Sequence, residues 1–290
     1  MEPILLIGAS GQLGTDLRRT LPQGALIPLT RADLDVTDRD AVERVLAAHA
    51  PAWVINTAAY HRVDDIETKD ARLAFAVNEV AVGHLARVCS RLGARLLHLS
   101  TDYVFGAGPP GPYAEDAPPA PLSVYGQSKL AGERLVRDAS LDHVIVRSSG
   151  LYGLAGSAGK GGNFVETMLR LAREGRDIRV VDDQVLTPTY TADLAGAIAQ
   201  LLAVPPPGGI YHLTNAGECS WFEFAERIFD LGDVARKLTR TTSDEFGAAA
   251  CRPSHSVLSN IRAVTLGVPP LRAWPEALQA YLRAKAHLAD

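Results

Sequence analysis

The sequence predicts an α/β protein built on a doubly wound parallel sheet, followed by a smaller α/β lobe towards the C-terminus. Short apolar runs that suit strands buried on both faces alternate with segments of helical periodicity along the first half of the chain. A glycine-rich turn follows the first apolar run, at a place where such sheets commonly bind a nucleotide. This alternation favours parallel strands that are joined by helices.

The composition is that of an ordinary globular protein of 290 residues, with 21% charged and 47% hydrophobic residues. The net charge of −4 favours neither nucleic acid nor an anionic membrane as a partner. No apolar run approaches the roughly 20 residues that span a bilayer. The three cysteines, Cys89, Cys219 and Cys251, lack paired spacing, and the histidines lack zinc-ligand spacing. We therefore expect a cytoplasmic protein without a metal site.

The first strand and the turn after it indicate a nucleotide site. Residues 3–7 are the apolar run, and Gly8, Gly11 and Gly14 follow it before a helical pattern of leucines. Glycines at this spacing let the backbone turn tightly and approach a pyrophosphate at the helix N-terminus. A tight turn without a ligand is the alternative interpretation.

The end of the second strand bears on the choice of cofactor. The strand is predicted over residues 26–29, and Arg31 follows it where an acidic residue would bind the ribose hydroxyls of NAD. An arginine there accommodates the 2′-phosphate of NADP, so we expect NADPH, with NADH as the alternative. Asp35 and Val36, after a short loop, are expected to lie against the adenine.

The next two strands are expected to bring polar groups to the same edge of the sheet. A helix over residues 40–49 precedes a strand over 53–56, and the small residues Thr57, Ala58 and Ala59 leave room for a ligand. A polar loop follows, in which His61 is either a ligand contact or a solvated side chain. A long helix over 71–92 ends at Gly93, and a strand over 95–100 leads to Thr101.

Tyr125 and Lys129 are the candidate catalytic pair. Their spacing of four puts them on one face of a predicted helix, so the ammonium is expected to lower the phenol pKa from its ordinary value of about 10. A tyrosine tuned in this way can give a proton to a carbonyl oxygen that receives hydride. The hydroxyl of Thr101 would hold that oxygen. The spacing alone is also typical of a solvated helix face.

The remaining elements divide between the sheet and the lobe. The glycine-rich residues 155–162 are expected to be either a lid or a disordered connection. We predict a Rossmann-type dinucleotide-binding domain over residues 1–149 and 175–200, and a substrate-binding lobe over 150–174 and 201–290. The further strands are expected at 143–147, 178–181 and 209–213, and the further helices at 163–174, 191–202 (capped by residues 191–193), 220–231 and 274–286.

The chain resembles a known family, the dTDP-4-dehydrorhamnose reductases of the extended short-chain dehydrogenase/reductases. The resemblance rests on GASGQLG at 8–14, STDYVFG at 100–106 and YGQSKLAGE at 125–133, together with VVDDQVLTPTYTADLA at 180–195. It extends over nearly the whole chain, and the second and third motifs together are specific to this branch.

The resemblance implies that NAD(P)H reduces the C4 ketone of dTDP-4-dehydro-L-rhamnose, which gives dTDP-L-rhamnose for cell-surface polysaccharide. A homodimer is a further expectation. The implied catalytic residues are Thr101, Tyr125 and Lys129. The candidate cofactor-binding residues are Gly8, Ser10, Gly11, Gln12, Leu13, Arg31, Asp35, Val36, Thr57, Ala58, Ala59, Tyr125 and Lys129. The candidate substrate-binding residues are His61, Val63, Thr101, Asp102, Tyr103, Asn163 and Arg252.

Two departures from the family pattern leave alternatives open. Gly150 stands where many members have a tryptophan beside the sugar, so another nucleotide-linked 4-keto-6-deoxy sugar is a second candidate substrate. Asp16 and Ala192 stand where some members hold magnesium with acidic side chains, so no metal is predicted there. A third hypothesis is a non-catalytic NADP-binding regulatory subunit similar to the methionine adenosyltransferase beta subunit. The complete catalytic set argues against it.

Overall fold

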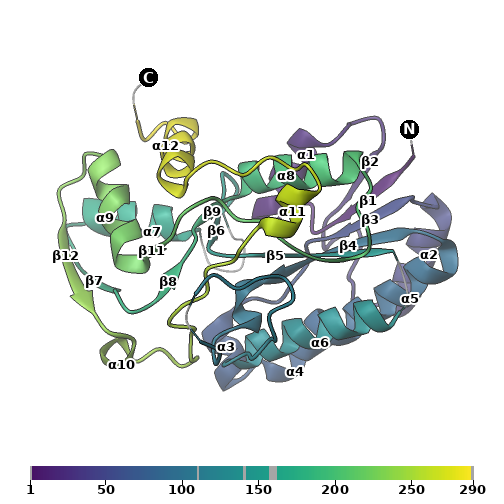
Figure 1. Ribbon diagram of the computed structural model, residues 1–290, viewed down its shortest axis with the longest axis horizontal. Coiled ribbons are helices and arrows are strands. Elements are labelled where there is room, and N and C mark those ends of the chain that lie inside the picture. Colours follow the sequence, from purple (N-terminus) through teal and green to yellow (C-terminus); the bar gives the residue numbers. More distant parts are fainter. Residues whose placement is uncertain (1, 110, 140–141, 157–161, 289–290) are drawn as a thin grey trace.

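Six parallel strands form the central sheet of the computed structural model, which describes residues 2–109, 111–139, 142–156 and 162–288. Neighbouring strands follow the order β10-β5-β4-β3-β1-β2 (Figure 1). Their bounds are Ile4–Ile7 for β1, Leu26–Leu29 for β2, Trp53–Asn56 for β3, Arg95–Thr101 for β4, His143–Ser148 for β5 and Gly209–His212 for β10. The predicted doubly wound parallel sheet is therefore confirmed, and the order of strands reverses next to β1.

Helices cover both faces of this sheet (Figure 1). On one face, α1 and α8 bury Leu17 and Ile198 against the strands, and on the other face α2, α5 and α6 bury Leu46, Leu85 and Val136. Burial of these apolar side chains from both sides explains why the strands read as continuous apolar runs. The helices span Gln12–Thr20 (α1), Thr191–Ala203 (α8), Arg39–His49 (α2), Val82–Leu92 (α5) and Val124–Asp138 (α6).

The long helix predicted over residues 71–92 is confirmed, but its middle is a π-helical segment. Gly93 ends it in the left-handed conformation at φ 69°, as predicted. Within the π segment, the Asn78 side chain accepts from Tyr60 N (2.9 Å) and donates to Ser128 Oγ (3.0 Å). The close approach of α6 requires Gly132, where a Cβ would lie 2.1 Å from the Asn78 carbonyl oxygen. The three parts are Ala71–Phe75 (α4), Ala76–Ala81 (η1) and Val82–Leu92 (α5).

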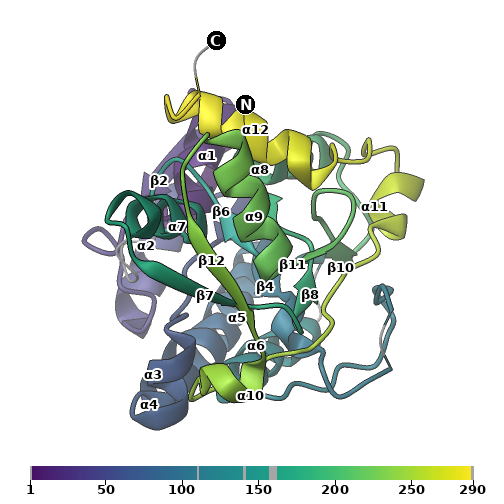
Figure 2. The same cartoon turned by 90° about the vertical axis from the view of Figure 1, so that its left-hand side faces the viewer.

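A second group of elements packs around an aromatic core that includes Tyr152, Phe224, Phe229 and Tyr281. Figure 2 shows the parallel strands β7 and β12 side by side, next to α9. The elements of this lobe are Phe164–Arg173 (α7), Asp177–Val181 (β7), Trp221–Leu231 (α9), Lys237–Thr241 (β12), Ser243–Phe246 (α10) and Trp274–Ala284 (α12). Short strand pairs join it to the sheet: Leu151–Tyr152 (β6) with Thr189–Tyr190 (β9), and Val185–Leu186 (β8) with Cys219–Ser220 (β11).

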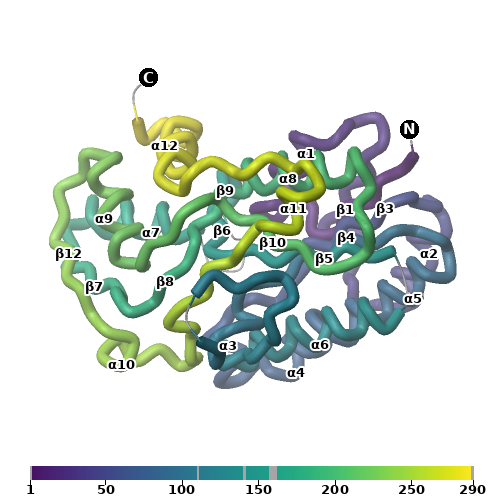
Figure 3. The backbone as a smooth tube through the Cα atoms, in the orientation of Figure 1, coloured from purple at the N-terminus to yellow at the C-terminus, as the bar shows by residue number. Residues whose placement is uncertain are grey.

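The chain crosses between the sheet and the lobe more than once. Figure 3 follows it from β5 into α7 and β7, back to α8 and β10, and out again to α9 and β12. Strand pairing also crosses the predicted domain boundaries, because β10 is an edge strand of the large sheet and β7 pairs with β12 in the lobe. The division into two domains stays a prediction. Its bounds assign β10 to the lobe and β7 to the dinucleotide-binding domain, whereas their strand pairing assigns each to the opposite part.

Several short elements differ from the sequence-based expectation. Val63–Thr68 forms a helix, α3, within what was predicted to be a polar loop after residue 60. The helix α8 is not capped by residues 191–193: Tyr190 is its N-cap, and Thr191 is the first helical residue. The Thr191 hydroxyl instead donates a hydrogen bond to Oδ2 of the buried Asp16 at 2.6 Å. Asp102–Val104 (η2) and Ile261–Thr265 (α11) complete the elements used below.

Two sequence-based expectations concern the connection after β6 and the membrane. Residues 157–161 of the predicted lid or connection at 155–162 lie outside the described residues. Of the helices that the structure describes, none has the length and hydropathy needed to cross a bilayer.

Candidate active site

A cavity of about 1380 Å³ opens at the carboxyl ends of the strands, between the sheet and the lobe. The residues after β1 and β3 line it, on either side of the point where the strand order reverses. Doubly wound sheets bind ligands at this position, because the loops diverge there and leave a crevice. The volume exceeds that of an ordinary single-ligand pocket, so a dinucleotide and a second ligand fit together.

Every residue predicted from the sequence to bind cofactor or substrate, or to act in catalysis, lines this one cavity. The lining includes Gly8, Ser10, Gly11, Gln12, Leu13, Arg31, Asp35, Val36, Thr57, Ala58, Ala59, His61, Val63, Thr101, Asp102, Tyr103, Tyr125, Lys129, Asn163 and Arg252. The structure therefore brings the predicted set together, while the role of each residue stays a prediction.

The glycine turn after β1 has the shape that a pyrophosphate needs. Gly8 adopts a φ of +83°, and a Cβ there would lie 2.6 Å from Thr57 Oγ1. At Gly14 a Cβ would lie 2.2 Å from the Gly8 carbonyl oxygen, so the helix α1 starts directly against the turn. The buried Gln12 Oε1 at the first residue of α1 has no hydrogen-bond partner within the described residues. An oxygen without a partner at the cavity fits a hydroxyl donor, such as that of a ribose.

Arg31 lies at the rim of the cavity. Its side chain is 86% exposed and its Nη2 is 3.5 Å from Asp35 Oδ2. Asp35 also accepts from the Thr37 amide and hydroxyl, and these hydrogen bonds lower its pKa. The carboxylate is therefore ionised at neutral pH and holds the arginine loosely beside the cavity.

Thr101, at the end of β4, is held by its neighbours. Its hydroxyl donates to Asp102 Oδ1 at 3.0 Å and accepts from the Tyr103 amide at 3.2 Å. Asp102 is 3% exposed, and its other oxygen accepts from Ser149 (2.8 Å) and Ser256 (2.6 Å). Burial raises the pKa of Asp102, whereas these hydroxyl hydrogen bonds lower it. The carboxylate thus orients the Thr101 hydroxyl.

Tyr125 lies in the first turn of α6, beside Tyr103, with the two ring centroids 5.6 Å apart. Burial raises the pKa of the Tyr125 phenol above its ordinary value, and the hydrogen bond with Thr101 partly opposes this shift. The expectation that this pKa is lowered is wrong for this structure, because desolvation of the buried phenol is the largest influence on it. Tyr125 is therefore protonated at neutral pH and is equipped to donate a proton.

Lys129 lies one turn further along α6 and is 1% exposed. Its Nζ donates to the Leu99 carbonyl at 2.7 Å and is 3.3 Å from His98 Nε2. Burial lowers the pKa of Lys129 to about 8, against the opposing effect of the Glu133 charge. The amine therefore exchanges its proton near neutral pH.

Two candidate substrate residues are already occupied by contacts within the chain. The Asn163 amide accepts from the Glu166 N–H at 3.0 Å and donates to the Tyr281 hydroxyl, so it caps α7. Both terminal nitrogens of Arg252 donate to the Asp64 carboxylate, at 3.2 and 2.7 Å. Their assignment as substrate contacts stays a prediction, since both side chains would have to exchange partners.

The sequence analysis missed Asn56 and His98. Asn56 ends β3, His98 lies within β4, and both are buried; His98 Nε2 lies 3.3 Å from Nζ of the predicted catalytic residue Lys129. Each follows apolar residues, since Asn56 comes after Trp53–Ile55 and His98 lies between Leu97 and Leu99, and this contrast was the available signal. Ser149 and Ser256, which bond to Asp102, carried no such signal because they lie in loops.

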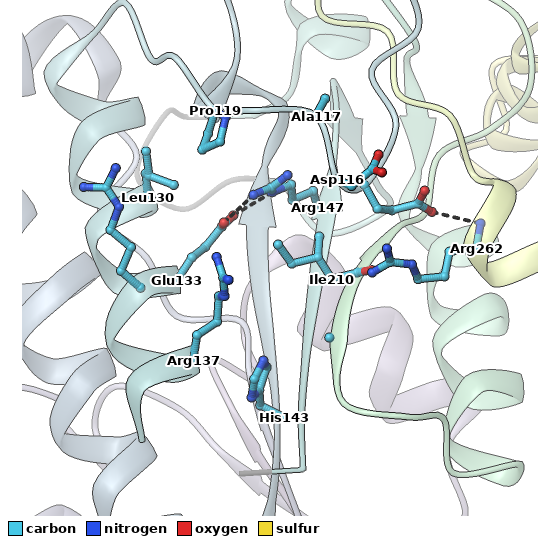
Figure 4. A pocket seen from close by; sticks show the side chains of 13 residues that line it. Asp116, Ala117, Pro119, Leu130, Glu133, Arg137, His143, Arg147, Ile210 and Arg262 are labelled. Atoms are coloured by element: carbon cyan, nitrogen blue, oxygen red, sulfur yellow. Dashed lines mark hydrogen bonds and ion pairs between the residues drawn. The ribbon is translucent and has the colours of Figure 1, made fainter. Parts of the chain in front are cut away.

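A smaller cavity of about 360 Å³ lies between α6, β5, β10 and α11 (Figure 4). There Arg147 meets Glu133 through hydrogen bonds of 2.9 and 2.6 Å. Arg262 donates its backbone N–H to Glu115 at 3.0 Å and its guanidinium N–H to the Ile210 carbonyl. Of the predicted site residues, none is among those that line it. The larger cavity is therefore the candidate active site.

Comparisons with known proteins show which family and which solved structures the chain is similar to. A family model described as "RmlD substrate binding domain" matches residues 1–287. A dTDP-4-dehydrorhamnose reductase of Streptomyces griseus is 44% identical over 282 residues, covering 94% of this chain and 91% of the relative. A dTDP-4-keto-6-deoxy-D-glucose reductase of Streptomyces niveus is 38% identical and covers 94% of each chain. The crystal structure of the Bacillus anthracis dTDP-4-dehydrorhamnose reductase in complex with NADP matches with a TM-score of 0.92 at 38% identity, covering 98% of this chain and 99% of that one.

Proposed function

This chain belongs to the RmlD family, and we propose that it reduces the C4 ketone of dTDP-4-dehydro-L-rhamnose with NADPH to give dTDP-L-rhamnose. The observation that carries the proposal is the meeting of Thr101, Tyr125 and Lys129 in the same cavity as the glycine turn. A relative that is 44% identical carries the name of this activity, and a relative of known structure binds NADP.

The protein's contribution is position, a proton and electrostatics. The nicotinamide, when bound, supplies the hydride. Tyr125 donates its phenolic proton to the oxygen that becomes the C4 hydroxyl, and its burial keeps that proton in place until then. The Thr101 hydroxyl donates to Asp102 in this structure, so it must leave that carboxylate in order to donate to the substrate oxygen. Lys129 provides an amine that gains or loses a proton near neutral pH.

The residues that would hold the dinucleotide are those of the glycine turn, Gln12, Arg31 and the segment from Thr57 to Ala59. The crowding at Gly8 and Gly14 and the unpartnered oxygen of Gln12 fit such a ligand. Arg31 stands where the 2′-phosphate of NADPH would lie and supports NADPH over NADH. The NADP-bound relative supports the same choice.

The direct test measures NADPH oxidation by the purified protein with dTDP-4-dehydro-L-rhamnose, and identifies the product by chromatography and mass spectrometry. We expect rapid oxidation and dTDP-L-rhamnose as the product. Tyr125→Phe is the matched control, because it keeps the ring and removes only the proton donor. No oxidation together with tight NADPH binding would favour either a different keto-sugar substrate or the regulatory-subunit hypothesis.

A second candidate substrate is another dTDP-linked 4-keto-6-deoxy sugar. Gly150 lines the cavity with a φ of +56°, and a Cβ there would lie 3.1 Å from Pro188 Cα, so this backbone does not accept the tryptophan of other members. The Streptomyces niveus relative carries the name of such a reductase. The same assay with dTDP-4-keto-6-deoxy-D-glucose separates the two, since the better substrate has the higher kcat/KM.

The setting of the reaction extends the proposal. We place it in the cytoplasm, where nucleotide-linked sugars and NADPH meet, and we propose a homodimer and a product used for cell-surface polysaccharide. Size-exclusion chromatography with light scattering tests the oligomeric state.

A further inference from the structure

Two buried polar side chains lie side by side under the active site. Asn56 of β3 and His98 of β4 are paired in register, and their exposed fractions are 2% and 0%. Asn56 Nδ2 lies 3.2 Å from His98 Nδ1. Burying a polar group is costly unless its hydrogen bonds are satisfied, so the direction of each bond here is strongly constrained.

A backbone amide decides which atom donates and which accepts in each of these hydrogen bonds. The Ala58 N–H, in the segment predicted to contact the dinucleotide, donates to Asn56 Oδ1 at 3.1 Å. An amide N–H can only donate, so this bond orients the Asn56 side chain and turns its NH₂ group towards His98. Since that NH₂ group also only donates, His98 Nδ1 must accept. A neutral imidazole then carries its single proton on Nε2.

The proton on His98 Nε2 points at Lys129. Nε2 lies 3.3 Å from Lys129 Nζ, and the same Nζ donates to the Leu99 carbonyl at 2.7 Å. An ammonium group has three N–H donors and no lone pair, so it cannot accept from Nε2–H. A neutral amine has one lone pair and can do so. The chain of bonds from Ala58 through Asn56 and His98 therefore matches the neutral form of Lys129.

The charges around Lys129 allow this form. Burial lowers the pKa of His98 well below its ordinary value, so the imidazole is neutral. Glu133 favours the ammonium, but its carboxylate is shared with Arg147 through two hydrogen bonds. The buried titratable or charged side chains of α6 and of the elements packed against it are, besides Lys129, Glu133 of α6, His98 of β4, Asp102 of η2, Arg147 of β5, and His84 and Cys89 of α5. Tyr103 of η2 and Tyr125 of α6 are half-buried.

We propose that Asn56 and His98 are positioning residues that hold the Lys129 amine as a hydrogen-bond acceptor and so set the pH at which Lys129 takes up its proton. On protonation Lys129 gains one proton from solvent, has no lone pair left, and releases His98 while it keeps its bond to Leu99. The contact with Ala58 links this event to the dinucleotide segment. Only the expected effect on turnover rests on the proposed function; the hydrogen bonds and the protonation of Lys129 do not depend on it.

The first test measures the proton on His98 without any substrate. The NMR spectrum of protein with ¹⁵N-labelled histidine reports the tautomer of each of the eight histidines, and the signal lost in His98→Gln identifies His98. We expect the neutral form with the proton on Nε2 throughout the neutral pH range. A proton on Nδ1, or a charged imidazole, would overturn the proposal.

The second test measures the pKa of Lys129 directly. Protein with lysine labelled at ¹³Cε is titrated, and Lys129→Met assigns the signal. His98→Leu removes the Nε2–H donor, so the pKa of Lys129 should rise by about one unit, the size of one hydrogen bond to one protonation state. His98→Gln restores an N–H donor at a similar reach and should return the pKa towards that of the parent. An unchanged or lowered pKa in His98→Leu would contradict the proposal.

His212→Leu is the matched control, because His212 is also a buried histidine, in β10, and lies outside the predicted site. It should leave the pKa of Lys129 unchanged. The pH profile of kcat should shift in parallel with the Lys129 pKa in the His98 variants. If the NMR shifts appear without any turnover, the proposed function fails while the hydrogen-bond chain stands. If turnover is present and the NMR shifts are missing, the hydrogen-bond chain fails alone.

Discussion

Two buried ionisable side chains, Lys129 and Glu133, lie one turn apart on the same helix but in opposite situations. Glu133 is paired with Arg147 through two hydrogen bonds (Figure 4). It also accepts from the Ser100 hydroxyl, so its charge is paired and both of its oxygens accept hydrogen bonds. Lys129 has a carbonyl and a histidine as partners, and no carboxylate of the described residues forms an ion pair with it. The pKa of Lys129 is lowered to about 8 as a result of burial.

The difference separates a structural charge from one that can react. A buried ion pair resists change, because removal of one partner leaves an uncompensated charge. A buried amine without a counter-charge changes protonation easily, which is what a proton-transfer site requires. We therefore expect changes around Glu133 to reduce stability, and changes around Lys129 to reduce turnover while the fold survives.

The largest effect on stability is expected at the ion pair between Glu133 and Arg147. Glu133→Gln leaves the Arg147 guanidinium buried at 2% exposure without a carboxylate, which should lower the free energy of unfolding by about 3–5 kcal/mol. Urea denaturation followed by circular dichroism measures this loss. In the double variant Glu133→Met/Arg147→Leu the loss should be smaller, because neither charge remains. A single variant as stable as the parent would remove the distinction between the two regions.

Tyr125→Phe should lower kcat by at least about a hundredfold, the range that a general acid contributes, with little change in stability. The hydroxyl is the only group removed, and the ring contact with Tyr103 is kept. Single-turnover kinetics at saturating NADPH, with a denaturation curve beside it, measure both quantities. Turnover close to that of the parent would exclude Tyr125 as the proton donor.

Lys129→Met should abolish a pH dependence of stability. The folded pKa of about 8 lies below the ordinary value of 10.5, so between these values the unfolded chain binds a proton that the folded protein has released. The contribution of this group to stability is therefore lowest below about pH 8 and rises by up to about 1.4 kcal/mol per pH unit between the folded and the unfolded pKa. Denaturation curves at a series of alkaline pH values should show the rise in the parent only. The variant should also impair turnover and cofactor binding.

Arg31→Ala should have the smallest effect, because the side chain is 86% exposed and its charge is screened by solvent. We expect about a fivefold weaker binding of NADPH with NADH almost unchanged, the size of one exposed phosphate contact. Fluorescence titration with both coenzymes measures the ratio. Equal losses for the two would mean that Arg31 does not read the 2′-phosphate. The free energy of unfolding should not change, because Arg31 lies at the exposed rim of the cavity and takes no part in the buried contacts of Lys129 and Glu133.

The sequence by itself determined the sheet and the set of side chains at its edge. Periodicity and chain order were enough, because parallel strands joined by helices deliver their carboxyl ends to one side, and Gly8, Thr101 and Tyr125 follow or face those ends. The glycine turn and the Tyr–Lys spacing are local patterns, and local backbone geometry decides whether they form. The boundaries of β2 and β3 were predicted to the residue for the same reason.

Only the tertiary structure decided the protonation of that set. The pKa of Tyr125 is raised and that of Lys129 is lowered because both are buried, and burial depends on packing between elements far apart in the chain. The pairing of Asn56 with His98 and the placement of β7 and β10 likewise join residues that no local pattern relates. Desolvation is a property of the assembled interior, so residue types show which groups are present, and the fold sets which of them carry charge.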